Sequence, residues 1–416
     1  MKFGGALMGD ASGIKKVAGL IEEYSCESLV VVVSALGKTT NALEELYRLS
    51  LDKKEMDMAF FKIKQYHLGI AQKLMPNISS QFSTCIDKIF DELWDALNDS
   101  YDDRYQAYDC IVSYGEELSS CILFHYLTDL GLPAKIISSK NLIVTDSNFT
   151  DASIDWTYTS KTVASRLVPA LEKNDVVITQ GFVGADKFGK ATTLGREGSD
   201  FTAAILGNLL DAEDVTIWKN VPGLMNADPA RFSNAVKIDS LSYHEAIELA
   251  YFGASVIHPK TIQPLKQKNI PLFVRPYYDS SLPPTSITND TSNDGEQPGI
   301  IIKDNQVLLS ISTLNLSFIA EENLKNIFDA FSKNKIHINL MQNSAVSFSV
   351  CFNKDTSKFE SLLYDLKENY SLRYNTGLQL ITVRHYNDEL VDELIGKRKV
   401  YLVQKSRITV QLLFKP

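Results

Sequence analysis

The segment TTLGREGSDFTAAIL, residues 192–206, carries the residue types best suited to hold an anion. Gly195 and Gly198 flank Arg196, and Asp200 precedes a run of helix-forming residues. Glycines let the backbone turn tightly and approach a ligand, a helix N-terminus offers free N–H groups, and an arginine can clamp a carboxylate with two hydrogen bonds. Asp200 can orient donors or help to hold Mg²⁺. The segment predicts an anion site, and a capped helix beside a solvated arginine is the alternative.

Lys2 is a second residue that could serve anion chemistry. It stands before the paired glycines Gly4 and Gly5, where backbone could approach a phosphate. Only Met1 precedes it in this sequence, so we expect either that a supporting strand begins upstream of this start or that the side chain of Lys2 is loosely held.

Two further segments combine glycine with polar residues. The segment SALGKTTN, residues 34–41, follows an apolar run, but Val33 stands where a P-loop needs its first glycine. A plain strand-to-helix turn capped by Thr40 or Asn41 is therefore the alternative to a ligand loop. The segment VSYGEELSS, residues 112–120, is predicted to place two glutamates on a turn after a short strand, and a solvated helix start is its alternative.

The composition sets bounds on the class of protein. At 416 residues the chain is long enough for two or three domains, and 44% hydrophobic with 22% charged residues is typical of globular proteins. A net charge of −9 argues against nucleic-acid partners and anionic membranes. No apolar run approaches the roughly 20 residues that a membrane span needs. Five scattered cysteines without CxxC spacing predict thiols in a reducing cytoplasm and no metal site.

Alternating strand and helix patterns are expected to position these residues. The run SLVVVVSAL, residues 28–36, is typical of a strand buried on both faces of a parallel sheet. Periodic apolar residues predict helices over 10–24 and through most of 41–130, with Asp10 or Ser12 as a cap for the first. The order predicts an α/β three-layer sandwich with a mostly parallel sheet. Further strands are expected at 134–138, 175–184, 214–221 and 270–276, and further helices at 160–172, 199–210, 243–251 and 259–268.

The pattern changes in the C-terminal quarter. Residues 277–299 are rich in Pro, Ser, Asn and Asp and are too long for a compact turn. The segment GIIIK, residues 299–303, is interpreted as the last strand of a first domain, 1–303. Residues 304–416 then predict two ferredoxin-like units, about 307–375 and 376–416, the second one abbreviated.

Seven segments in order make the chain resemble the aspartokinases, amino-acid kinases with C-terminal regulatory ACT domains. They are KFGG (2–5), VSALGKTTN (33–41), SYGEELS (113–119), TQGFVG (179–184), TTLGREGSD (192–200), WKNVPGLMNADP (218–229) and FGASVIHP (252–259). The resemblance implies transfer of the γ-phosphoryl group of MgATP to the side-chain carboxylate of L-aspartate. This step opens the route to lysine, threonine and methionine.

The resemblance also implies a role for individual residues. Lys2 would neutralise the transferred phosphoryl group and Asp200 would organise the centre. Arg196 would clamp the α-carboxylate of aspartate and Glu116 would hold its ammonium group. No residue is assigned as a dedicated metal ligand. Aspartate would further contact Ser34, Thr40 and Phe182, and the nucleotide would lie near Gly4, Gly5, Lys219, Asn220, Asp228, Arg231 and Ser255.

Several positions depart from the family pattern. Ala6 and Leu7 follow the glycine pair where relatives have Thr-Ser, and Ser255 replaces a lysine that reaches the nucleotide phosphates in many relatives. Relatives usually have a Gly-Gly pair after the arginine, and here that pair is Glu197-Gly198. The arginine of the usual DPR motif is shifted by one residue, to Arg231. A catalytically weakened regulatory or binding protein of the same fold is therefore one alternative. Another amino-acid kinase that uses a different acyl-phosphate or carbamate substrate is a second alternative.

The ACT-like region predicts regulation and assembly. Relatives that lysine inhibits often carry an acid where Ala345 stands, so lysine feedback is not expected, whereas another amino-acid effector stays open. Exposed strand edges in such units predict a homodimer.

Overall fold

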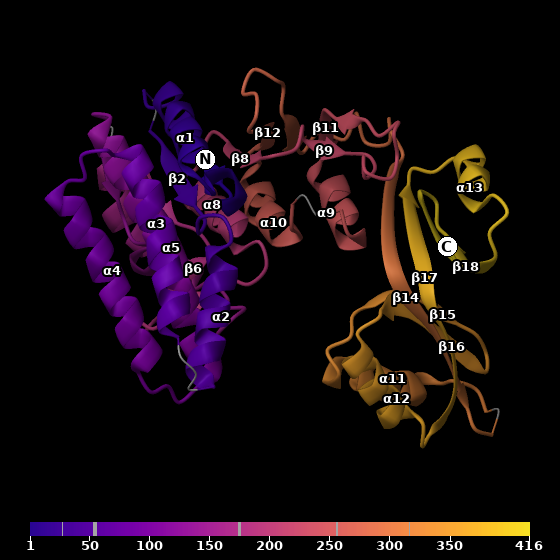
Figure 1. Ribbon diagram of the computed structural model, residues 1–416. Helices are drawn as coiled ribbons and strands as arrows, with labels where there is room; N and C mark the ends of the chain where they lie inside the picture. The colour runs from indigo at the N-terminus through magenta and orange to yellow at the C-terminus, as the bar shows by residue number, and fades with distance from the viewer. Residues whose placement is uncertain (27, 53–55, 174–175, 255–256, 316) are drawn as a thin grey trace. The chain divides into compact units, whose positions relative to one another are not determined.

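The computed structural model describes residues 1–26, 28–52, 56–173, 176–254, 257–315 and 317–416. The chain separates into two compact units (Figure 1). The first comprises Met1–Leu224, Asp239–Ile247 and Val256–Ser292, and the second comprises Met225–Ile238, Glu248–Ser255 and Asn293–Pro416. Within the described ranges, no helix has the length and apolar character needed to cross a bilayer.

The first unit is built on a mostly parallel sheet with the strand order β11-β13-β12-β8-β1-β2-β5-β3. Among the described residues, β12 and β13 form the antiparallel pair of this sheet, so β13 and its parallel neighbour β11 run opposite to the other strands. Strand β13 lies inside the polar stretch 277–299, where no strand is expected from the sequence. The strands are β1 (Lys2–Phe3), β2 (Val30–Val33), β3 (Ala134–Ile136), β5 (Val176–Gln180), β8 (Val215–Lys219), β11 (Ser240–Ser242), β12 (Leu272–Pro276) and β13 (Thr285–Thr288).

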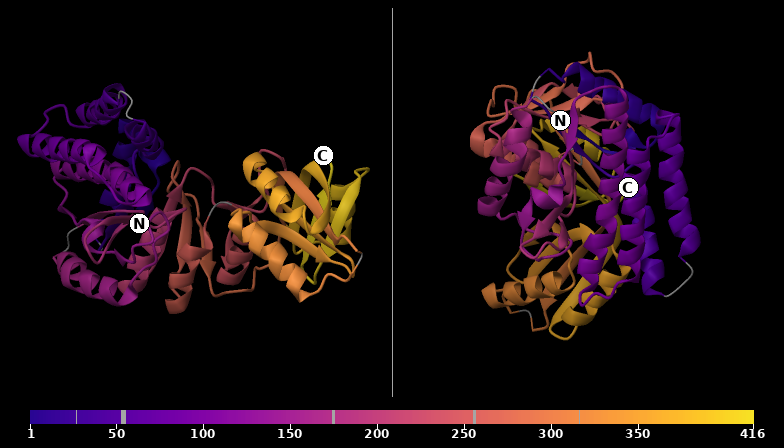
Figure 2. Two further views of the ribbon diagram at one scale, coloured as in Figure 1. Left: turned by 90° about the horizontal axis from the view of Figure 1, so that it is seen from below. Right: turned by 90° about the vertical axis from the view of Figure 1, so that its left-hand side faces the viewer.

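Both faces of this sheet are covered, as the valine run predicts. Val31 and Val33 of β2 pack into one core with the N-terminal helices, and Val32 between them is buried as well. The long helices α3, α4 and α5 run side by side in the first unit (Figures 1 and 2). These helices are α1 (Ala11–Glu23), α2 (Thr39–Leu51), α3 (Asp57–Leu74), α4 (Ser80–Asn98) and α5 (Arg104–Asp129).

The remaining elements of the first unit surround the strand ends. Strands β4, β6 and β7 form a separate small sheet of order β4-β6-β7. Helix α8 contacts β1, β2 and β8 and packs against α10. The elements are η1 (Gly5–Met8), η2 (Ser139–Asn141), β4 (Val144–Thr145), α6 (Trp156–Thr162), η3 (Val163–Leu167), α7 (Val168–Leu171), β6 (Val183–Asp186), β7 (Ala191–Thr193), α8 (Gly198–Leu209), α9 (Tyr243–Phe252, shared with the second unit) and α10 (Pro259–Lys268).

The structure contains one of the helix caps predicted from the sequence and lacks the other. Asp10 caps α1 by accepting a hydrogen bond from the backbone N–H of Gly13, as predicted. Neither Thr40 nor Asn41 caps α2, because that helix already begins at Thr39. The strand and turn expected before Glu116 are absent, and the whole segment belongs to the continuous helix α5.

The described residues of the second unit form an antiparallel sheet of order β15-β16-β14-β17-β19-β18, with three helices of the unit's own and the end of α9. Two long strands, β14 and β17, pair along most of their length. Residues 299–303 are not the last strand of the first unit, because they open β14 and pair with Leu380–Arg384 of β17. The elements are β9 (Leu224–Met225) and β10 (Lys237–Ile238), which form a small ladder, then β14 (Gly299–Thr313), α11 (Glu321–Lys333), β15 (Ile338–Asn343), β16 (Ser347–Asn353), α12 (Thr356–Leu366), β17 (Tyr370–Arg384), α13 (Asp388–Ile395), β18 (Val400–Lys405) and β19 (Thr409–Phe414).

Candidate functional site

A cavity of about 820 Å³ opens at the carboxyl ends of β1, β2 and β8 in the first unit. Ligands bind at this edge in parallel α/β sheets because loops and helix N-termini converge there. The cavity gathers residues from segments that are far apart in the sequence. Eight residues predicted from the sequence line it: Lys2, Ser34, Thr40, Glu116, Phe182, Arg196, Asp200 and Lys219.

The centre of the cavity is an ion triad of two lysines and one aspartate. The Nζ atom of Lys2 lies 2.6 Å from Oδ1 of Asp200, and the Nζ atom of Lys219 lies 3.1 Å from Oδ2. Burial by itself raises the pKa of Asp200, but the two ammonium groups outweigh it and hold the pKa below its usual value. The triad therefore carries one net positive charge at neutral pH, which suits a phosphate.

Lys2 is firmly held, and the prediction of a loose side chain is wrong. Strand β1 lies between β2 and β8, with Lys2 in register with Val32 and Ile217. The next residue, Phe3, is fully buried and stacks on Trp218 with ring centroids 6.1 Å apart. A strand of two residues is sufficient because it pairs on both sides with mostly buried strands of the same sheet.

Close packing around Gly5 requires a glycine at this position. A Cβ atom on Gly5 would lie 2.1 Å from the carbonyl oxygen of Ala35, which is not a possible contact. The backbone N–H of Gly37 also donates a hydrogen bond to the carbonyl of Gly5 at 2.9 Å. The turns that follow β1 and β2 are thus held together, but Gly4 and Gly5, two predicted nucleotide contacts, are not among the residues that line the cavity.

Glu116 faces the cavity from helix α5 and is almost fully buried. Its Oε1 atom accepts a hydrogen bond from the backbone N–H of Ala35 at 3.3 Å, and its buried Oε2 atom has no hydrogen-bond partner. Burial raises the pKa of Glu116 to about 8, against the hydrogen bond from Ala35 and the charge of Lys2, which lower it. The carboxyl group is therefore positioned to receive a cation from a ligand.

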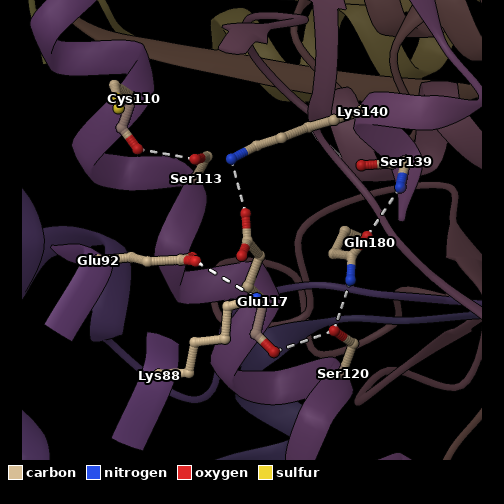
Figure 3. A network of polar contacts seen from close by, with 9 residues as sticks. All are labelled: Lys88, Glu92, Cys110, Ser113, Glu117, Ser120, Ser139, Lys140 and Gln180. Atoms are coloured by element: carbon tan, nitrogen blue, oxygen red, sulfur yellow. Dashed lines mark hydrogen bonds and ion pairs between the residues drawn. The ribbon is translucent and has the colours of Figure 1, made fainter. Parts of the chain in front are cut away.

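The neighbouring acid, Glu117, points to a different partner. Its carboxylate lies 2.6 Å from the ammonium group of Lys140, as Figure 3 shows. In the same network, Gln180 donates a hydrogen bond to Ser120 and accepts one from the backbone N–H of Ser139 (Figure 3). Consecutive helical residues differ by about 100° in direction. Glu116 therefore faces the cavity, whereas Glu117 pairs with Lys140 outside the cavity lining.

The loop from 195 to 200 has the form that its glycines predict. Gly195 has a φ of 75°, and the glutamate at 197 adopts a left-handed φ of 56° at the N-cap of α8. Arg196 between them is exposed at the cavity, where it can reach a ligand carboxylate. Phe182 and Thr150, which also line the cavity, have φ values of 68° and 72°. Such strained residues are concentrated at ligand sites in proteins.

Asp109 is a residue of this site that sequence reasoning missed. Its Oδ2 atom accepts hydrogen bonds from the backbone N–H groups of Thr150 and Thr193, and its Oδ1 atom accepts one from the Thr193 hydroxyl. Both threonines line the cavity. Asp109 is separated from Thr193 by 84 positions, and no motif or spacing in the sequence connects them.

Several predicted nucleotide contacts are not part of the cavity. Asn220 is exposed just after β8. Asp228 and Arg231 belong to the second unit, where the guanidinium group of Arg231 pairs with Asp304. Ser255 lies outside the described residues, and the roles of these four residues in nucleotide binding stay predictions.

His258 has a structural role at the start of α10. Its Nδ1 atom accepts a hydrogen bond from the backbone N–H of Lys260 at 3.2 Å, which caps α10.

Comparisons with known proteins agree with the geometry. Residues 1–276 match the model of the amino acid kinase family. Lysine-sensitive aspartokinase 3 of Escherichia coli is 30% identical over 395 residues, which are 92% of this chain and 86% of that protein. Chloroplastic aspartokinase 1 of Arabidopsis thaliana is 32% identical over 376 residues, 87% of this chain and 64% of that one.

Solved structures give the same result for the fold. Aspartokinase III of E. coli in complex with aspartate and ADP superposes with a TM-score of 0.82 and 26% identity, covering 100% of this chain and 95% of that one. The same E. coli protein in complex with lysine and aspartate gives a TM-score of 0.83 and 27% identity, with coverages of 99% and 94%. The predicted fold class, a mostly parallel α/β domain followed by ACT-like units, is confirmed.

Proposed function

The chain belongs to the aspartokinases of the amino acid kinase family, and from this premise we propose that it transfers the γ-phosphoryl group of ATP to the side-chain carboxylate of L-aspartate. The observation that carries the proposal is the single cavity that unites Lys2, Glu116 and Arg196. Lys2 would face the phosphoryl group of ATP. Glu116 would bind the ammonium group of aspartate, and Arg196 would bind its α-carboxylate. This arrangement favours an amino-acid acceptor over an acceptor that lacks an ammonium group.

The residues of the cavity act mainly by positioning and by neutralising charge. Phosphoryl transfer asks for little covalent work from the protein. Lys2 and Lys219 reduce the repulsion between the anionic phosphoryl group and the attacking carboxylate, and Asp200 fixes the direction of both ammonium groups. The acceptor carboxylate is already ionised at pH 7, so no residue needs to act as a general base.

Magnesium fits this cavity as a companion of the nucleotide. Mg²⁺ usually takes one or two protein carboxylates and fills its other positions with phosphate oxygens and water. Asp200 is the carboxylate beside the two lysines, and it would hold the ion where it could neutralise phosphate charge. The described residues contain no cluster of three carboxylates close enough to form a metal site of their own.

The test is an assay of ADP release with MgATP and L-aspartate. We expect Lys2→Ala and Arg196→Ala each to lose several kcal/mol of transition-state stabilisation, the first in kcat and the second mainly through KM for aspartate. Absence of ADP formation at millimolar aspartate would refute the proposed reaction. If calorimetry then showed nucleotide or aspartate binding without turnover, the chain would be a binding protein with the kinase fold.

The second unit supports proposals on assembly and control. Strands β15 and β18 lie at the two edges of its sheet, and edge strands are available for pairing with a second copy of the chain. We expect a homodimer, to be measured by light scattering. The exposed turn between β15 and β16, which contains Ala345, is the expected place for an amino-acid effector, and it is tested by adding lysine, threonine or methionine to the assay.

A further inference from the structure

Three residues that can ligate metals or react with oxidants meet between helices α4 and α5, away from the cavity lining. They are Cys85 of α4 and Cys121 and His125 of α5, and their ligand atoms all lie within 4.8 Å of one another. The two sulfur atoms are 2.8 Å apart. No other group of three His, Cys, Asp or Glu residues in the described ranges is arranged in this way.

The two thiols have different surroundings. Cys85 is partly exposed and Cys121 is buried. The S–H group of Cys121 donates a hydrogen bond to the sulfur of Cys85. That hydrogen bond, followed by the contact with His125, lowers the pKa of Cys85 to about 5 although burial opposes it. The same hydrogen bond, with burial, raises the pKa of Cys121. The pair therefore combines a more acidic, partly exposed thiol with a less acidic, buried one.

The distance between the sulfur atoms favours a sulfur–sulfur bond over a shared metal ion. Two thiolates on a tetrahedral Zn²⁺, each about 2.3 Å from the ion, stand about 3.8 Å apart. The two sulfur atoms of Cys85 and Cys121 are only 2.8 Å apart, which is too close for two ligands of one zinc ion. Structural zinc sites also use four protein ligands, and only three are present in this group.

We propose that Cys85 and Cys121 are a peroxide-sensitive dithiol that closes to a disulfide between α4 and α5. The Cys85 thiolate attacks one oxygen of hydrogen peroxide, the O–O bond breaks, and Cys85 becomes a sulfenic acid while the other oxygen leaves as water after taking a proton. The thiolate of Cys121, whose proton passes to His125, then attacks the Cys85 sulfur. The S–O bond breaks, and the hydroxyl leaves as a second water with the proton from His125. Two thiols and one peroxide thus give one disulfide and two waters.

This disulfide would join the second-longest and longest helices of the N-terminal helical layer, since α4 spans Ser80–Asn98 and α5 spans Arg104–Asp129. Helix α5 also carries Glu116, about 7.5 Å along the helix axis from Cys121 at 1.5 Å per residue. The inference does not depend on the proposed kinase reaction, because it rests on residues that do not line the cavity.

The experiment uses the full chain, reduced, freed of reductant and treated with stoichiometric hydrogen peroxide. Remaining thiols are alkylated under denaturing conditions, and intact mass and peptide mapping follow. We expect two of the five cysteines to become resistant to alkylation in the wild type and the linked peptides to contain Cys85 and Cys121. In Cys121→Ser we expect no disulfide and a sulfenic acid at Cys85, trapped with dimedone.

Cys110→Ser is the matched control, because Cys110 lies on the same helix but outside the cluster, and it is expected to form the disulfide at the wild-type rate. Five alkylatable cysteines after peroxide treatment, or a link that does not contain Cys85, would overturn the proposal. Retention of one equivalent of Zn²⁺ through gel filtration by the reduced wild type, lost in Cys85→Ser, would overturn it in favour of a metal site. Circular dichroism of each variant separates a failure to fold from a failure to oxidise.

Discussion

Glu116 makes the affinity for aspartate depend on pH in a way that can be calculated. Burial raises its pKa to about 8, so about 3% of the carboxyl groups are ionised at pH 6.5 and about half at pH 8. If the ammonium group of aspartate binds only the ionised form, the apparent affinity scales with that fraction. We therefore expect kcat/KM for aspartate to rise about 16-fold from pH 6.5 to pH 8.

The groups that face Glu116 are consistent with this direction. Lys2 on β1 favours ionisation, whereas Glu117 on the same helix and the buried surroundings oppose it, and burial is the largest effect. The variant Glu116→Gln removes the titration and the charge together. We expect its pH profile to be flat over this range and its KM at pH 8 to be higher by about 10- to 150-fold, the loss of one charge-assisted hydrogen bond of roughly 1.5–3 kcal/mol.

The matched control is Glu117→Gln, because this neighbour pairs with Lys140 and does not line the cavity. Its profile should keep the wild-type slope. The assay is steady-state ADP release at saturating MgATP with aspartate varied, in buffers of constant ionic strength. A flat profile in the wild type, or a slope that persists in Glu116→Gln, would show that another group sets the pH dependence.

The titration of Glu116 also affects the free energy of unfolding. A rise in pH is expected to increase the affinity for aspartate but to lower the stability of the fold. The unfolded chain releases the Glu116 proton near its ordinary pKa of 4.5 and the folded chain near 8, so the folded state binds more protons between these values. The stability due to this group is therefore present below pH 4.5 and is lost as the pH rises through 8. We expect its contribution to fall by on the order of 1 kcal/mol per pH unit in this window. Urea unfolding of wild type and Glu116→Gln measures the difference.

Three further substitutions test how the cavity is built. Asp200→Asn leaves two ammonium groups without their shared carboxylate, so we expect a loss of about 3–5 kcal/mol in urea unfolding together with loss of turnover. Gly5→Ala places a Cβ atom against the carbonyl of Ala35, and we expect a lower melting temperature and a higher KM for ATP; wild-type values would contradict the packing argument. Glu197→Gly relieves a left-handed residue, so we expect a gain of about 1 kcal/mol in unfolding free energy, and a loss would show that the glutamate is held favourably.

Much of the site could be predicted because each motif is local. Gly195, Arg196 and Asp200 lie within six positions, and their order alone predicts a turn that leads into a helix N-terminus. In parallel sheets such turns share one edge, so separate glycine-rich segments such as 2–5 and 192–200 are expected to converge. The cavity contains residues from both segments.

The sequence pattern predicts helices through most of 41–130, but it does not show that the segment around Glu116 is part of one. A surface helix shows an apolar stripe at a period of 3.6 residues. Helix α5 is buried along most of its length, and Ser113, Glu116 and Ser119 are buried together with its apolar residues. The short apolar run before Glu116 therefore resembles a strand. Only contacts with distant segments, such as Ala35, establish that it is a helix.

The cavity contains unfavourable features that a ligand would relieve. Glu116 is buried with one oxygen unpartnered, and three residues that line the cavity, Thr150, Phe182 and Glu197, are held in left-handed conformations. Each such backbone residue costs of order 1–3 kcal/mol and is maintained only because the surrounding structure determines it. Asp109 supplies part of that support at Thr150. Since an ammonium group would satisfy Glu116 and favour its ionised form, bound aspartate should raise the melting temperature more at pH 8 than at pH 6.5.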